Sequence, residues 1–430
     1  MEVFKEMLIE FSVTNFRSIR ETQTLSMAAS RYFKDIEEQN SFDTGIKGLP
    51  RLLRSAAIYG PNASGKSNLI LALSFMRFMV LSSAKKIQEG EDLNITPFLL
   101  DQTSKTKESE FEVIFVEGTV RYQYGFALNK ARVLREWLVA YPEGRPQRWF
   151  DREYDVANNQ DTYEFGPKFL GGRLRQDWKN ATRSNALFLS VAVQFNSEQL
   201  KPVFHWFQKR LSVITQHNLL DPGYTASLCE TDEGKEKVAV FLNSADLSIA
   251  DIRIDKKKFS SEDLPKDMPA ELKELYRKEM DGKDLVNIKF MHKDIETGEL
   301  VPFGPDKESD GTKNLFAFAG PWLDVIGSDK VLFVDEIDSS LHPLIVHQLV
   351  RLLHRSGSKA QLVFTTHDTT ILSQDILRRD QVWFIEKDKS HASKLYPLSD
   401  FKVREKEAIE RGYLRGRYGA VPLVSDFIKG

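Results

Sequence analysis

The pattern of apolar residues predicts a strand followed by a helix near residue 60. Ser55–Tyr59 is a short, mostly apolar run typical of a buried strand. After a segment rich in glycine and serine, apolar residues recur at the spacing of one helix face. These residues are Leu69, Leu73, Met76 and Val80. The chain is therefore expected to pass from strand to loop to helix in this region.

Strand patterns also occur on both sides of this region. Residues 7–14 and 23–27 have such patterns, and residues 111–141 contain three more. Glu117-Gly118 separates the first two of these three as a hairpin turn. After residue 313, helix and strand patterns alternate instead, which predicts a parallel sheet with crossover helices. We therefore expect an α/β fold with an added antiparallel β layer.

The middle of the chain has a different character. Helical patterns cover residues 186–211 and 235–247, and a charged helical pattern at 261–280 is interrupted by Pro265 and Pro269. The sequence thus predicts a mostly helical insertion over residues 171–284. This insertion would separate an N-terminal lobe of residues 1–170 from a C-terminal lobe of residues 285–430.

Composition narrows the class of protein further. The chain has 430 residues, 28% charged residues and a formal net charge of -2, so no global basic field indicates nucleic acid. Cys229 is the only cysteine, which excludes intramolecular disulfides and cysteine-based zinc sites and favours a reducing cytoplasm. No apolar run long enough to span a bilayer is expected, and the first 20 residues lack a signal-peptide core.

The loop before the predicted helix carries the most specific motif. Residues 60–67 match the phosphate-loop pattern G-x-x-x-x-G-K-[ST] at every fixed position. Its glycines let successive backbone N–H groups face a phosphate chain, Lys66 would reach the β- and γ-phosphates, and Ser67 would hold Mg²⁺. The expected nucleotide contacts are Gly60, Pro61, Asn62, Ala63, Ser64, Gly65, Lys66, Ser67 and Asn68.

Two later strand patterns end in residues that suit the same chemistry. An apolar run at 331–334 is followed by Asp335, which can hold Mg²⁺, and by Glu336, which can orient an attacking water. A second apolar run ends before His367, whose order and spacing suit a sensor of the γ-phosphate. Catalysis is therefore assigned to Lys66, Glu336 and His367, and the metal to Ser67 and Asp335.

A short polar segment before the helical pattern at 313–326 has two interpretations. Ser309 and Gly311 can simply cap this helix. The same geometry can instead offer amides and a hydroxyl to a γ-phosphate held by another subunit.

The order of these motifs resembles the ABC-type ATPase heads of the SMC/RecF class. The Gly-Pro-Asn start of the loop and residues 9–19 (IEFSVTNFRSI) also look like that class. More narrowly, the chain resembles compact AAA/ABC ATPases of bacterial abortive-infection and anti-phage operons, such as the PARIS ATPase and RloA/AbiL-like proteins. The tail, with Arg404 and residues 413–422 (YLRGRYGAVP), looks like that subgroup.

The resemblance implies a P-loop NTPase of ABC/SMC-head type that uses ATP and Mg²⁺. It makes Ser309 and Gly311 a signature acting in trans and Asp338 the D-loop aspartate at a dimer seam. The chain departs from the pattern at Glu308, where a leucine is usual, and at Lys313, where transporters often have glutamine. The glutamine loop is not placed, and its candidates are Gln88, Gln102 and Gln123.

Three functions follow as expectations. The first is a cytoplasmic ATP-driven switch of an anti-phage system, a homodimer or larger homo-oligomer that controls an effector (nuclease or toxin) encoded beside it. This hypothesis includes a phage-derived trigger and no association with a membrane. The second is a RecF/SMC-like DNA-repair or recombination ATPase that clamps DNA. Its basic residues would be Arg173, Arg175, Lys179, Arg183 or residues 256–258. The third, a transporter ATPase, is disfavoured by the β-rich first lobe and the insertion.

Overall fold

The computed structural model describes residues 5–34, 36–215, 220–245, 247–260, 264, 268–280, 284–339, 341–403 and 408–422. The chain forms two compact units. The first unit comprises Met1–Thr215, Val325–Asp338 and His342–Gly430, and the second comprises Gln216–Asp324 with Ser339–Leu341. Arg404 of the tail motif and Pro265 lie outside the described residues.

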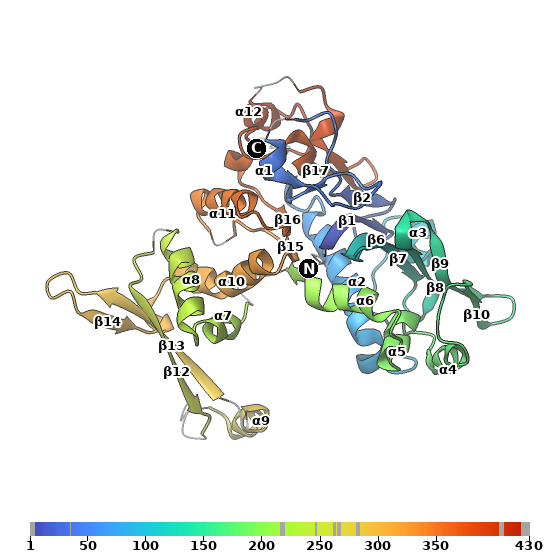
Figure 1. Ribbon diagram of the computed structural model, residues 1–430, viewed down its shortest axis with the longest axis horizontal. Coiled ribbons are helices and arrows are strands. Elements are labelled where there is room, and N and C mark those ends of the chain that lie inside the picture. Colours follow the sequence, from blue (N-terminus) through green and yellow to red (C-terminus); the bar gives the residue numbers. More distant parts are fainter. Residues whose placement is uncertain are drawn as a thin grey trace, which may run out of the picture. The chain divides into compact units, whose positions relative to one another are not determined.

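A mostly parallel sheet forms the centre of the first unit (Figure 1). In spatial order its strands are β11 (Leu211–Ile214), β15 (Val331–Val334), β16 (Gln361–Thr365), β5 (Ser55–Tyr59), β17 (Val382–Lys387) and β18 (Ser393–Pro397). The first five strands run parallel, and β18 pairs antiparallel with β17. Every residue of β5, β15 and β16 is buried, which explains why these strands read as continuous apolar runs.

An antiparallel sheet forms a second layer of the same unit. Its order is β10 (Gln160–Phe165), β9 (Gln147–Asp155), β8 (Val133–Tyr141), β7 (Val120–Leu128), β6 (Ser109–Gly118), β1 (Lys5–Thr14) and β2 (Gln23–Ser26). A separate two-stranded sheet pairs β3 (Ser41–Phe42) with β4 (Leu52–Leu53). The expected hairpin between β6 and β7 is confirmed, and its Gly118 has the left-handed φ of 66° that such a turn requires.

Helix α2 (Lys66–Lys86) is the core helix of the first unit. Its residues Leu69, Leu73, Met76 and Val80 are fully buried in the same cluster as residues of both sheets, as their spacing predicted. The expectation that no segment is long and apolar enough to cross a bilayer was wrong, because α2 meets that test by length and composition. Half of its most apolar window is buried within the protein, so its apolar character is explained by its place in the core.

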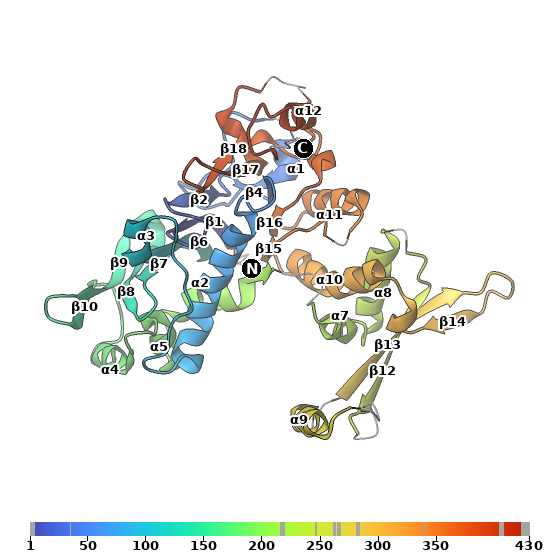
Figure 2. The same cartoon turned by 180° about the vertical axis from the view of Figure 1, so that it is seen from behind.

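Shorter helices complete the first unit. They are α1 (Glu37–Asn40), α3 (Gln102–Thr106), α4 (Leu174–Ala181), α5 (Phe188–Gln194), α6 (Lys201–His205), a π-helix (Trp206–Arg210), α11 (Pro343–Arg355) and α12 (Ile409–Leu414). Single 3₁₀ turns occupy Pro142–Gly144, Thr369–Ile371, Arg379–Gln381 and Leu398–Asp400. Figure 2 shows the paired strands β17 and β18 from behind, with α12 near them.

The structure divides the chain differently from the prediction of an insertion over residues 171–284. Residues 171–215 belong to the first unit. The reason is packing, since the Trp206 ring stacks on Phe115 of the antiparallel sheet at 4.3 Å and Leu211 begins a strand of the parallel sheet. The helix expected over 186–211 consists of short pieces, with Pro202 at the start of α6.

The second unit contains both helices and strands, where a mostly helical segment was expected. Its helices are α7 (Pro222–Leu228), α8 (Asp232–Asn243), α9 (Ala270–Met280) and α10 (Asp310–Gly327), and a 3₁₀ turn covers Pro305–Lys307. The last residues of α10 belong to the first unit. Its sheet has the order β12 (Asp251–Lys258), β13 (Asp284–Lys293) and β14 (Leu300–Phe303). The sequence did not predict β12, because its second half is dominated by exposed lysines.

Candidate functional site

The phosphate-loop residues connect β5 to α2, as the motif predicted. Gly65 immediately precedes α2 with a left-handed φ of 111°, and a Cβ there would lie 2.1 Å from Ser393 Oγ. A Cβ on Gly60 would lie 2.2 Å from the carbonyl oxygen of Ile385. Both glycines of the pattern are therefore required by close contacts with distant parts of the chain.

The Lys66 side chain is folded back into the loop. Its Nζ donates hydrogen bonds to the carbonyl oxygens of Gly60 at 2.8 Å and Pro61 at 3.2 Å, and only 5% of the residue is exposed. Burial lowers the pKa of Lys66, and the charges of Glu336, Asp335 and Asp338 oppose this effect. The loop thus holds a buried ammonium group with little solvation of its own, which fits an anionic ligand.

The two carboxylates predicted at the end of β15 have different environments. Asp335 is buried, and Thr365 Oγ1 donates a 2.7 Å hydrogen bond to its Oδ1. The same Thr365 hydroxyl accepts the backbone N–H of Glu336 at 2.6 Å. Glu336 has a left-handed φ of 48°, and its side chain is exposed. Thr365 therefore joins the ends of β15 and β16, holding Asp335 in place while Glu336 faces solvent.

The loops that follow these strands also meet. The backbone N–H of His367 donates to Asp338 Oδ2 at 3.1 Å. Asp338 Oδ1 and Ser64 Oγ are buried and have no hydrogen-bond partner within the described part of the chain. Buried polar atoms normally have hydrogen-bond partners, so a bound ligand or its water could supply the partners of these two atoms.

One cavity of about 330 Å³ brings together most of the predicted residues of the first unit, but Gly60, Pro61, Asp335 and Asp338 are not among the residues that line it. It is lined by Ser18, Asn62, Ala63, Ser64, Gly65, Lys66, Ser67, Asn68, Glu336, His367 and Lys387. Parallel strands place their carboxyl ends at one edge of a sheet, which is why the ends of β5, β15 and β16 converge here. Among the described residues, no group of three or more His, Cys, Asp or Glu side chains is arranged to hold a metal.

Of the two residues predicted to hold Mg²⁺, Ser67 lines the cavity with a hydroxyl, and Asp335 is a buried carboxylate at the end of β15. This small donor set fits an ion that keeps most of its water ligands and takes others from substrate phosphates. Gln88, Gln102 and Gln123 are not among the residues that line the cavity.

Sequence reasoning missed the residues that support the loop. Ser393 Oγ donates to the carbonyl oxygen of Ser64 at 2.6 Å, and Ser18 Oγ lies 2.7 Å from Ser393 Oγ. Asn68 Nδ2 in turn donates to Ser18 Oγ at 2.7 Å. Ser18 lies in the IEFSVTNFRSI segment, and membership of that segment was the only indication of its role. Ser393 is 375 residues from Ser18 in the sequence and lies in no motif.

Ser309 and Gly311 lie in the second unit, at the start of α10. Ser309 Oγ accepts the backbone N–H of Thr312 at 3.1 Å, which is the capping role that the sequence allowed. The preceding Glu308 is 2.7 Å from Nε2 of His292. Their assignment as a trans-acting signature stays a prediction.

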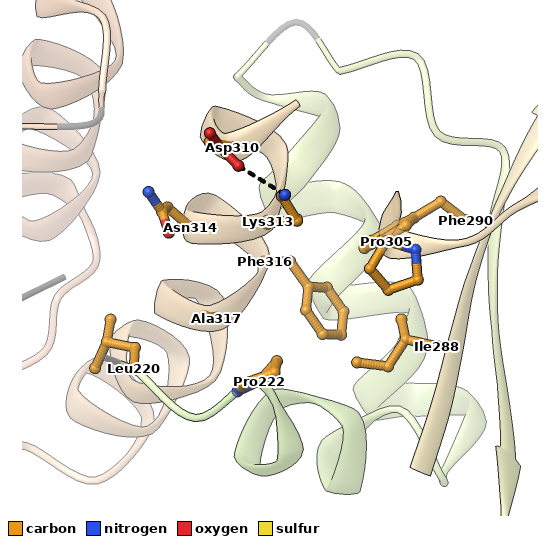
Figure 3. A pocket seen from close by; sticks show the side chains of 10 residues that line it. All are labelled: Leu220, Pro222, Ile288, Phe290, Pro305, Asp310, Lys313, Asn314, Phe316 and Ala317. Atoms are coloured by element: carbon orange, nitrogen blue, oxygen red, sulfur yellow. Dashed lines mark ion pairs between the residues drawn. The ribbon is translucent and has the colours of Figure 1, made fainter. Parts of the chain in front are cut away.

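The second unit contains a larger cavity of about 620 Å³ (Figure 3). It is lined mainly by apolar side chains, and the rings of Phe290 and Phe316 meet edge to face at 5.2 Å. An ion pair of 2.6 Å between Lys313 and Asp310 lies among the polar lining residues. Because a nucleotide needs phosphate-binding amides and cations, the smaller polar cavity of the first unit is the candidate site.

Comparison with known proteins agrees with this choice. Residues 55–373, well over half of the chain, match a family described as "AAA domain, putative AbiEii toxin, Type IV TA system". The chain belongs to this family. The matched segment begins with β5 and continues past His367, so it contains the whole phosphate-loop cavity except Ser18 and Lys387.

Solved structures with similar folds have low identity to the chain. An SMC head bound to the C-terminal winged-helix domain of ScpA is 13% identical, with 91% of this chain and 97% of that chain covered and a TM-score of 0.39. The SMC head domain from Thermotoga maritima is 14% identical, with 91% of this chain and 98% of that chain covered and a TM-score of 0.37. The recombination mediator RecF with ATP is 13% identical, with 92% of this chain and 100% of that chain covered and a TM-score of 0.38. No curated protein sequence matches the chain.

The expected fold class is confirmed by the family and the sheet. The chain is a P-loop protein of the AAA-domain family, with a mostly parallel sheet and an added antiparallel sheet. Strand β16, which precedes His367, lies between β5 and β15. The phosphate loop after β5, the carboxylates after β15 and His367 after β16 therefore lie at one edge of the sheet.

Proposed function

We propose that this protein is an ATP-hydrolysing switch of a bacterial anti-phage, abortive-infection system. The observation that carries the proposal is the cavity in which Lys66, Glu336 and His367 meet. The family description, with its AbiEii toxin and type IV toxin–antitoxin system, supports the defence context. The resemblance of the motifs to the PARIS ATPase and RloA/AbiL-like proteins supports the narrower assignment.

The residues of the cavity divide the chemistry among them. Lys66 and the amides at the start of α2 bind the β- and γ-phosphates. Glu336, exposed at the cavity, orients and deprotonates the attacking water, and His367 contacts the γ-phosphate. Mg²⁺, held by Ser67 and by Asp335 through water, would neutralise charge on the phosphates when bound.

A second subunit would complete the site. Ser309 precedes the 18-residue helix α10 and Gly311 lies in its first turn, where N-terminal amides can bind a γ-phosphate in trans. Asp338, with one buried oxygen unpaired within the described chain, would lie at the seam. ATP would then join two chains into a homodimer or larger assembly that holds or releases an effector.

The alternative, a DNA-clamping repair ATPase, has less support. Several basic residues that suggested it make contacts within the chain. Arg183 donates to the carbonyl oxygen of Ile87 at 2.7 Å, and Lys256 pairs with Glu230 at 2.6 Å. Arg175 lies over the Phe169 ring and Lys179 over the Tyr163 ring. Glu230 offsets the charge of Lys256, and the other three side chains are held by contacts within the chain, so they are less available to phosphates of DNA.

Substitution of Glu336 tests the ATPase. Glu336→Gln keeps the shape of the side chain but removes the base, so turnover should fall about 100- to 10,000-fold while ATP binding persists. Native mass spectrometry should then show ATP-bound dimers. The control Lys66→Ala should lose ATP binding itself. Turnover by Glu336→Gln at the rate of the parent would show that the base is wrongly assigned.

Mixing two inactive chains tests the trans site. Lys66→Ala and Ser309→Arg chains can form heterodimers with one intact and one doubly damaged site. We expect the mixture to regain hydrolysis that each variant lacks alone. If heterodimers form without any activity, the signature does not act in trans.

Phage plating tests the defence role separately. Cells expressing the protein with its neighbouring gene should resist phage, and Lys66→Ala should abolish that resistance. If an ATP-hydrolysing parent gives no resistance to any phage tested, the defence role fails while the ATPase assignment stands.

A further inference from the structure

A lysine outside the phosphate-loop pattern lines the candidate site. We propose that Lys387 binds the nucleotide on the side of its α-phosphate and nucleoside. This inference rests on the proposed function, because it takes the cavity of the first unit as an ATP site. It adds a binding residue that no motif in the sequence indicated.

The register of β17 brings Lys387 to the level of the loop. β17 runs parallel to β5, with Phe384 opposite Tyr59, the last residue before the phosphate loop. β17 continues for three residues past this point and ends at Lys387. The close approach of Gly60 to the Ile385 carbonyl shows that this extension lies against the loop. Lys387 is also paired with Ser393, whose hydroxyl bonds to Ser64.

The alternation of side chains along β17 directs Lys387 to the correct face. Successive residues of a strand face opposite sides, so Trp383, Ile385 and Lys387 share one face. Trp383 and Ile385 belong to the buried cluster that contains the apolar residues of α2. On the opposite face, the Phe384 ring stacks on Tyr413 at 5.4 Å. Lys387 therefore emerges on the side of the sheet where α2 begins.

The charge of Lys387 is available to a ligand. It forms no ion pair within the described part of the chain, and it is exposed at the cavity. Lys66 is the other cation of the cavity, and it already faces the charges of Asp335, Glu336 and Asp338. A nucleotide phosphate would bring more negative charge, so a second free ammonium group has an electrostatic reason to be there.

The strand order indicates which phosphate Lys387 contacts. The phosphate-loop strand β5 lies between β16 and β17. Glu336 and His367 follow β15 and β16, so they lie on one side of the loop, and Lys387 lies on the other. A nucleotide that presents its γ-phosphate to Glu336 and His367 must extend its α-phosphate and nucleoside toward Lys387.

Binding measurements with two nucleotides test this placement. Lys387→Met keeps the length of the apolar stem and removes the charge. We expect it to weaken binding of the non-hydrolysable β,γ-imido analogue of ATP and of ADP by the same factor, about tenfold. Isothermal titration calorimetry of the full chain with Mg²⁺ gives both constants. The matched control is Lys389→Met, an exposed lysine two residues away that does not line the cavity and should bind both nucleotides like the parent.

Each outcome decides between the possibilities. Weaker binding of the ATP analogue with unchanged ADP binding would put Lys387 beside the γ-phosphate and overturn the proposal. Unchanged binding of both would remove Lys387 from the site. The parent and Lys66→Ala are measured in the same assay. If the parent binds neither nucleotide, the proposed ATP site itself fails, which is distinct from failure of Lys387 alone.

Discussion

The cavities of the two units differ in the charged residues beside them. In the first unit Lys66 lines a small polar cavity and is 5% exposed, and Asp335, next to the cavity residue Glu336, is 8% exposed. In the second unit Lys313 and Asp310 form an ion pair beside a larger, mainly apolar cavity. The Lys313 side chain is 40% exposed and the Asp310 side chain is 92% exposed. Buried charges cost desolvation free energy, and an exposed ion pair contributes little. The smaller cavity, where the fold accepts that cost, is therefore the better candidate for chemistry.

The largest expected effect tests whether the second cavity is separate from nucleotide binding. Phe316→Ala removes a buried ring, which should destabilise the second unit by about 3 kcal/mol. Hydrogen–deuterium exchange of β13 and α10 should accelerate, while affinity for the ATP analogue stays within about twofold of the parent. The control Phe195→Ala, at a ring that is 57% exposed in the first unit, should have little effect. A large loss of nucleotide affinity in Phe316→Ala would show that the two cavities are coupled.

A smaller effect tests how the first unit fixes its buried charge. Thr365→Val keeps the shape of the side chain but leaves Asp335 and the Glu336 amide without their shared hydroxyl. We expect thermal unfolding to indicate a loss of about 1–3 kcal/mol, and hydrolysis to slow more than binding weakens. Thr365→Ser retains the hydroxyl and should restore most of both. Unchanged hydrolysis in the valine variant would mean that Thr365 does not position these groups.

The smallest effect concerns a partly buried carboxyl of the antiparallel sheet. Glu117 lies opposite Glu6 in the antiparallel sheet, and burial with the nearby Glu6 charge raises its pKa to about 7. Glu6 itself is paired with Arg210 at 2.5 Å, while Glu117 Oε2 has no partner within the described chain. Because the folded protein holds this proton more tightly than the unfolded chain does, stability should fall as pH rises from about 4.5 to about 7.

Glu117→Gln removes the titrating group. The variant should be more stable than the parent by about 1 kcal/mol at pH 8, with the difference vanishing near pH 5. Urea midpoints of both proteins between pH 5 and pH 8 measure this trend. Glu89→Gln, at an exposed glutamate, is the control and should change nothing. An equal pH dependence of Glu117→Gln and the parent would contradict the raised pKa.

Local patterns predicted the elements that depend on neighbours in the chain. The step from β5 through the loop to α2 was predicted because the motif, the apolar run and the helical spacing occupy contiguous residues. The β6–β7 hairpin was predicted for the same reason. Strand β12 was missed because three exposed lysines end it, and its partner β13 lies 26 residues further along the chain.

The candidate site shows the same division. Lys66, Glu336 and His367 were predicted because each follows an apolar strand pattern, and the cavity contains all three. Lys387 also follows an apolar run, at residues 382–385, but neither it nor Ser18 and Ser393 belongs to a nucleotide-site motif, and single lysines and serines are common on any surface. Only the pairing of β17 with β5 and the contacts of Ser393 gave them a place beside the loop.

The sequence by itself determined the chemistry of the phosphate loop, because backbone conformation and hydrogen-bonding groups there are set by residues within a few positions of one another. It also determined the apolar strands that carry Asp335 and His367 to one edge of a sheet. The tertiary structure decided which strands are neighbours, which residues form the two units, and which lysine faces the nucleotide cavity. These features depend on contacts between residues hundreds of positions apart, and such contacts are selected by packing of the whole chain rather than by any local pattern.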